Sequence, residues 1–69
     1  MNINIDEKLL EINILLHSQL YYTALREWVE LYNTWARSGG QDFTEKQEQL
    51  FFKQLNLINM NIQFQIHNI

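Results

Sequence analysis

Residues 20–40, LYYTALREWVELYNTWARSGG, hold both tryptophans and all three tyrosines of the chain. No breaker interrupts this stretch until the only two glycines of the sequence, Gly39 and Gly40, and the chain has no proline. The same absence extends back to Glu7, so the sequence predicts one helix over residues 6–38, roughly 45–50 Å long. Asn4 and Glu7 fit the N-cap and N3 positions of a capping box, with Asp6 as a competing cap.

The glycine pair predicts a turn into a second helix near residues 44–66. Gly39 is expected to take the left-handed conformation that ends many helices. Thr44 with Gln47 matches a second capping box, Asp42 with Glu45 is the alternative, and hydrophobic residue 43 precedes the first box as in a hydrophobic staple. Because the connection is short, the fold class is predicted as all-α, an antiparallel two-helix hairpin in a single domain spanning residues 1–69.

Residues 58–66 also fit a strand, because apolar and amide residues alternate along them. Met1–Ile5 alternates in the same way and would be the natural partner strand, although a frayed arm explains those five residues equally well. Nothing between Thr44 and Ile69 breaks a helix, however, and one hairpin cannot provide the other strands of a stable sheet. We therefore expect a helix here.

The apolar surface of the predicted first helix is wider than one partner helix can cover. A helix buried on one side needs an apolar stripe somewhat wider than about 100°, whereas the rows here cover well over half of the circumference. Burying each large side chain is worth about 1.5–3 kcal/mol. The sequence therefore predicts a homodimer or higher oligomer, such as a four-helix bundle. The three rows are Leu9, Ile12, Leu16, Leu20 and Leu31; Ile14, Tyr21, Leu25, Trp28, Tyr32 and Trp35; and Leu15, Tyr22, Val29 and Ala36.

Composition disfavours several classes of function. The net charge is -3 and the five basic residues are scattered, which argues against a nucleic-acid backbone as partner. The N-terminus lacks the basic and apolar regions of a secretion signal, and no apolar run reaches the ~18–20 residues of a membrane span. We therefore expect a cytoplasmic protein that binds no membrane. Abundant asparagine and isoleucine are typical of an AT-rich bacterial or phage genome.

The residues that commonly carry chemistry form no catalytic or metal-binding pattern. Cysteine is absent, and neither His17 nor His67 follows a glutamate by three residues, as a carboxylate metal site in a bundle would require. Ser18 directly follows His17, and neighbouring helix residues point about 100° apart. Two glutamate pairs, at positions 7 and 11 and at 27 and 30, fit solvated helix faces. We therefore expect no enzyme, no metal site and no cofactor, with His17 as a polar contact at a dimer interface.

We call the row with Tyr21, Trp28, Tyr32 and Trp35 the aromatic row. It is the most informative feature of the sequence for function. It fits the core or self-interface of a bundle, a groove for a partner protein, or a pocket in which Arg26 and Arg37 hold an aromatic anion such as a nucleotide. The first two interpretations predict a non-enzymatic helical interaction module, namely an adaptor, regulator or inhibitor that binds itself and another protein. The alternatives are ligand sequestration between protomers and a structural subunit of a larger helical assembly. The candidate interface residues are Tyr21, Leu25, Trp28, Tyr32, Trp35, Phe51, Leu55, Ile58 and Ile62.

Overall fold

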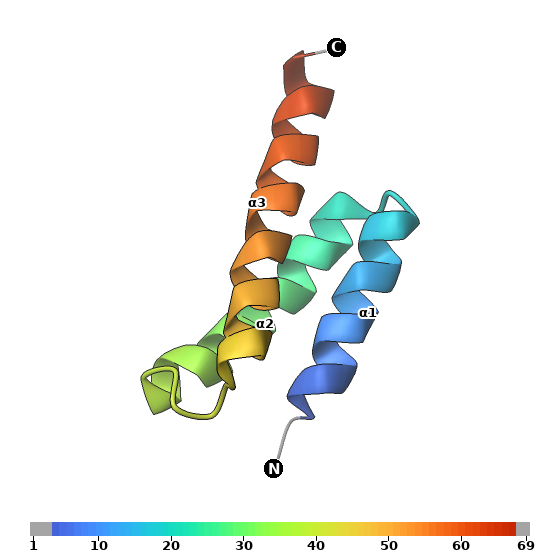
Figure 1. Ribbon diagram of the computed structural model, residues 1–69. Coiled ribbons are helices and arrows are strands. Elements are labelled where there is room, and N and C mark those ends of the chain that lie inside the picture. The colour runs from blue at the N-terminus through green and yellow to red at the C-terminus, as the bar shows by residue number, and fades with distance from the viewer. Residues whose placement is uncertain (1–3, 68–69) are drawn as a thin grey trace.

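A computed structural model describes residues 4–67, which form three helices and no strand (Figure 1). These are α1 (Ile5–His17), α2 (Tyr21–Ser38) and α3 (Glu45–His67). The chain reverses between α1 and α2, and α3 then packs on both and extends past them at its C-terminal end (Figure 1). The all-α prediction is confirmed. Residues 1–3 lie outside the described part, and residue 5 already belongs to α1.

The prediction of one continuous helix over residues 6–38 is wrong, because the chain turns at residues 18–20. Gln19 has a φ of 62°, in the left-handed region that non-glycine residues seldom adopt. The Gln19 amide donates to the Leu16 carbonyl at 3.1 Å, and the Leu20 amide donates to the Leu15 carbonyl at 2.9 Å. These two bonds form a Schellman motif built without glycine. The fold is therefore a three-helix arrangement rather than a two-helix hairpin.

Because of the turn, α1 and α2 both face a common core. One straight helix would instead have exposed apolar residues on two of its sides. The buried apolar residues come from every element: Leu9, Ile12, Ala24, Trp28, Leu31, Phe43, Phe51 and Ile58. Much of the wide apolar surface of residues 9–31 is therefore covered within the monomer. The predicted need for a partner chain no longer follows from this part of the sequence.

The α2–α3 connection follows the sequence closely. Gly39 is left-handed, with φ 64° and ψ 26°, and ends α2 as predicted. A Cβ on Gly40 would lie 3.0 Å from Trp35 Nε1, so this position also has little room for a side chain. The Thr44 hydroxyl accepts from the Gln47 amide at 3.1 Å, and the Gln47 side chain accepts from the Thr44 amide at 2.9 Å. This reciprocal pair confirms the Thr44–Gln47 capping box.

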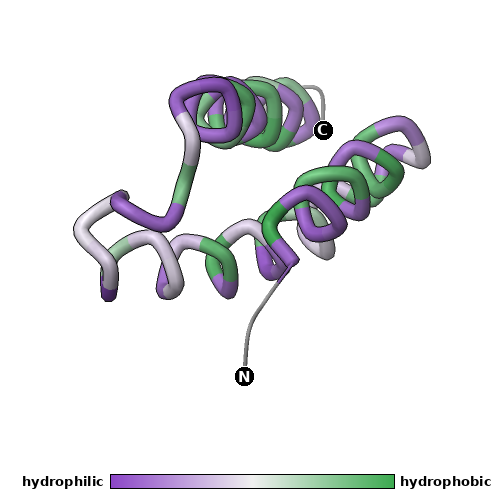
Figure 2. Tube along the Cα trace, turned by 60° about the horizontal axis from the view of Figure 1, so that its bottom comes forward, coloured by the Kyte–Doolittle hydropathy of each residue, from purple (hydrophilic) through white to green (hydrophobic). Residues whose placement is uncertain are grey.

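Residues 58–66 are helical, which confirms the helix interpretation over the strand. Hydrophobic and hydrophilic residues alternate along this part of α3, as along the other helices (Figure 2). The Asn61 side chain donates to the Leu57 carbonyl at 2.7 Å, so this amide adds a bond to its own helix. In the described part of the chain, no helix has the length and hydropathy that crossing a membrane would need.

Candidate interaction surface

Trp28 of the predicted aromatic row lies inside the core, where α2 meets α3. Trp28 stacks on Phe51 with ring centroids 4.3 Å apart and an interplanar angle of 9°. Its indole Nε1 also donates to the Phe51 backbone carbonyl at 2.8 Å. Helix carbonyls normally bond within their own helix, so this contact fixes α2 to one position along α3. Trp28 is therefore a core anchor that combines stacking with a buried hydrogen bond.

The row continues outward from Trp28 towards the molecular surface. Tyr32 stacks between Trp28 and Trp35, with centroid distances of 5.5 and 5.6 Å. Phe52 from α3 meets Trp35 edge-on at 5.5 Å and 90°. Trp35 Nε1 is buried beside Gly40 and finds no hydrogen-bond acceptor among the described residues. The outer end of the row is thus a half-buried aromatic cluster shared by two helices.

The structure divides the nine candidate interface residues into three groups. Trp28, Phe51 and Ile58 are buried in the core and cannot reach another chain in this fold. Tyr32 is exposed. The remaining five are partly buried, namely Tyr21, Leu25, Trp35, Leu55 and Ile62. Contact with another chain stays a prediction for the exposed and partly buried members.

Gln54 provides a buried polar link that the sequence did not reveal. Its side chain is fully buried, and Nε2 donates to the Leu9 carbonyl and to Asn13 Oδ1, both at 2.9 Å. Its Oε1 is also buried and has no hydrogen-bond partner within residues 4–67. Glutamine is usually exposed, so its residue type gives no sign of this burial. The residue instead joins α1 to α3 in the middle of the core.

A charged network joins α1 to α2 at the surface. Lys8 Nζ lies 3.0 Å from Glu27 and 3.6 Å from both Glu11 and Glu30. The hydrogen bond between Lys8 and Glu27 raises the pKa of Lys8 and lowers the pKa of Glu27. The spacing of Glu27 and Glu30 predicted only that they lie on a solvated helix face. Glu27 also pairs with Lys8 of α1. It holds the two antiparallel helices together.

The candidate chemical residues do not gather into a site. His17 is exposed at the last turn of α1 and lies outside the core, and the side chain of His67 is outside the described part. Among the described residues, no three of His, Asp and Glu are grouped closely enough to hold a metal ion. Arg26 and Arg37 are exposed on α2, while the faces of Trp28 are occupied by the protein's own rings.

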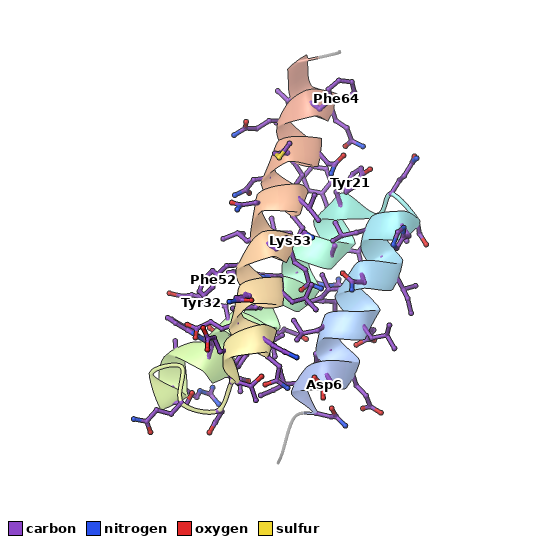
Figure 3. The ribbon with its side chains drawn as sticks, viewed as in Figure 1. Asp6, Tyr21, Tyr32, Phe52, Lys53 and Phe64 are labelled. Carbon is purple, nitrogen blue, oxygen red and sulfur yellow. The ribbon has the colours of Figure 1, made fainter. Side chains whose placement is uncertain are left out.

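Among the described residues, the two most exposed large apolar side chains, Phe64 and Met60, lie on the second half of α3. Leu57, Met60 and Phe64 are 39, 66 and 68% exposed and share one side of the helix, and we call these three residues the α3 surface. Ile66 is 56% exposed and lies on the opposite side of the helix from Leu57. Residues 54–69 include no Asp, Glu, Lys or Arg. Phe64 lies on the part of α3 that extends past Tyr21, the first residue of α2 (Figure 3). Further exposed apolar residues lie elsewhere, including Leu10, Ile14, Leu20, Tyr22 and Val29.

The geometry is the only guide to this surface. No protein-family model matches the chain, and comparisons with curated proteins and with solved structures likewise find no match.

Proposed function

We propose that this chain is a non-enzymatic helical interaction module, which acts as a homo-oligomer and presents an apolar helix surface to another protein. In this role it would serve as an adaptor, regulator or inhibitor. The observation that carries the proposal is the α3 surface, three large apolar side chains on one side of a helix half without charge. Soluble monomers rarely expose contiguous apolar patches of more than a few hundred Å² unless the patch binds something.

The composition of the exposed residues also supports an interface. Aromatic residues and methionine are enriched in protein–protein interfaces, while Lys, Glu and Asp are depleted in them. The α3 surface contains Phe64 and Met60, and the outer aromatic cluster adds exposed Tyr32. A flexible methionine beside rigid rings is typical of surfaces that adapt to a partner helix.

Oligomer mass and partner capture test the two parts of the proposal. Light scattering on the purified protein should give a mass well above the 8.4 kDa of one chain at micromolar concentration. Protein captured from source cells should include a partner at fixed stoichiometry, and that partner, once purified, should slow amide exchange on an exposed apolar helix face. A single-chain mass at every concentration would contradict self-association. Capture without any stoichiometric partner would contradict the adaptor role.

A further inference from the structure

We propose that the second half of α3 pairs antiparallel with the same segment of a second copy of this chain. This inference rests on the self-association in the proposed function and adds which surface is used and in which orientation. Leu57, Met60 and Phe64 follow i, i+3, i+7 spacing and therefore lie on one stripe of the helix. Ile58, the last fully buried residue of α3, points elsewhere into the core. The stripe is thus additional to the face that holds α3 on its own monomer.

The lack of charge on this segment favours a second copy over a charged partner. Residues 54–69 carry no Asp, Glu, Lys or Arg, so two copies can meet without like-charge repulsion. Asparagines and glutamines alternate with the apolar residues here, and an amide both donates and accepts hydrogen bonds. Amides can therefore pair with identical amides, as a two-fold interface requires, because such an interface brings the same patch of both copies together.

The exposed area of the stripe is sufficient for a weak dimer. At about 200 Å² per large side chain, the exposed fractions of Leu57, Met60 and Phe64 amount to roughly 350 Å² on each copy. Two copies would bury about 700 Å² of apolar area, and the neighbouring amides bring the total closer to the ~1,000 Å² expected of a specific interface. We therefore expect a dimer with a dissociation constant in the micromolar range.

The exposed apolar residues of α1 fit a second copy less well. Leu10 and Ile14 lie on a face that also carries Glu7 and Glu11. Two such faces would bring four carboxylates together, with only Lys8 of each copy nearby to offset them. This face is therefore the natural control surface, because its exposure resembles that of the α3 surface while its charge does not.

A matched pair of acidic substitutions tests the choice of surface. Met60 is 66% exposed and Leu10 is 60% exposed, and glutamate suits a helix nearly as well as methionine or leucine. We expect Met60→Glu to raise the dimer dissociation constant by more than about ten-fold, because it places two carboxylates at the contact. Leu10→Glu should leave the constant unchanged. Circular dichroism melts of dilute samples should show both variants folded like the unsubstituted chain.

The possible outcomes separate this inference from the proposed function. A dimer that persists unchanged in Met60→Glu overturns the α3 contact but leaves self-association standing. Equal dissociation by Leu10→Glu would assign the contact to α1 and also overturn it. A chain that stays monomeric into the high micromolar range overturns both the inference and the homo-oligomer part of the proposed function.

Single cysteines test the orientation, because the chain has no cysteine of its own. In an antiparallel pair the centre of the stripe, near Met60, lies on the two-fold axis, so Met60→Cys should cross-link to itself under mild oxidation. The two copies of residue 57 would be about 10 Å apart along the helix, beyond the reach of a disulfide. Mixing Leu57→Cys with Phe64→Cys should instead give the mixed disulfide. Self-cross-linking of Leu57→Cys, without the mixed product, would indicate parallel pairing and overturn the proposed orientation.

Discussion

The first half of α3, residues 45–56, is held in place by side chains from every neighbouring element, whereas much of the second half, residues 57–67, extends past them (Figure 1). The first half begins with a reciprocal capping box, contributes Phe51 and Gln54 to the core and has charged residues on its outer side. The second half contributes Ile58 and part of Ile62 to the core and otherwise exposes apolar and amide residues.

The difference between the halves separates two uses of apolar residues in one helix. In the first half, apolar contacts are combined with directional bonds such as Trp28 Nε1 to the Phe51 carbonyl, and these bonds fix the position of each helix. In the second half, the Asn61 side chain bonds to the Leu57 carbonyl within its own helix. The first half therefore specifies the monomer, and the second half is suited to contact between chains.

The largest expected effect comes from the anchor of the first half. Trp28→Ala should lower the free energy of unfolding by about 3–5 kcal/mol, because it empties a buried site and leaves the Phe51 carbonyl without its indole donor. Tyr22→Ala is the control, since Tyr22 is exposed on the same helix. Urea denaturation monitored by circular dichroism measures both. If Trp28→Ala kept its stability and lost only partner binding, Trp28 would be a binding residue rather than a core anchor.

Two isoleucines within the second half of α3 compare a buried and an exposed position with identical chemistry. Ile58→Ala should cost about 2–5 kcal/mol because Ile58 is fully buried. Ile66→Ala should change the free energy of unfolding by no more than about 0.5 kcal/mol, because Ile66 is exposed. Both should be measured by urea denaturation of dilute samples, in which dimerisation contributes little. Similar losses in the two variants would show that the end of α3 around Ile66 also belongs to the monomer core.

Two glutamines extend the comparison to polar side chains. Gln54→Ala should destabilise the fold by about 2 kcal/mol, because the Leu9 carbonyl and Asn13 lose a buried donor. Gln65→Ala, at an exposed position of the second half, should be neutral within about 0.5 kcal/mol. Gln54→Met keeps most of the volume and removes both bonds together with the unpartnered Oε1. Thermal unfolding of the three variants would then separate packing from hydrogen bonding, and a neutral Gln54→Ala would contradict a structural role for the link.

The helix ends show how much of this fold the sequence could predict. The ends with recognisable chemistry were predicted correctly: Asn4 accepts from the Glu7 amide at 3.2 Å, Gly39 is left-handed, and Thr44 pairs with Gln47. The turn at residues 18–20 uses the same Schellman geometry as Gly39, but Gln19 takes the left-handed position and Leu20 caps α2 without a side-chain bond. Local preference gives no sign of that turn. It persists because packing α1 and α2 on α3 outweighs the cost of a left-handed glutamine.

The candidate surface was predicted less well than the helices, for a related reason. A continuous first helix made the aromatic row look uncovered, so the excess apolar surface was assigned to residues 21–35. Once α1 folds back, Trp28 is core, while Tyr22, Val29 and Tyr32 stay exposed on α2 and further exposed apolar residues lie on α3. Ile58 and Ile62 were on the predicted interface, while Met60 and Phe64, at neighbouring positions of the same helix, were not. Their exposure depends on where α1 and α2 end, which periodicity within α3 cannot reveal.

The smallest expected effect comes from the ion pair between Lys8 and Glu27. The second half of α3 has no Asp, Glu, Lys or Arg with which to form such a pair. Lys8→Gln should lower the free energy of unfolding by about 0.5–1 kcal/mol near neutral pH, because it removes the link between α1 and α2. The folded pKa of Glu27 is lowered, so this stabilisation is present above the ordinary value of 4.5 and is lost as the pH falls through the folded value. The folded pKa of Lys8 is raised, so the stabilisation is present below the ordinary value of 10.5 and is lost as the pH rises through the folded value.

Urea denaturation at several pH values and salt concentrations measures this effect, with Lys53→Gln on the exposed side of α3 as the control. The difference between Lys8→Gln and the unsubstituted chain should disappear in acid and shrink in high salt, because salt screens exposed charges. The dimer mass should not respond to the same salt, because the proposed contact carries no charge. A salt-sensitive dimer would place the contact on a charged face such as that of α1. A Lys8→Gln effect that persisted in acid would mean that the lysine stem stabilises the helices by packing rather than by its charge.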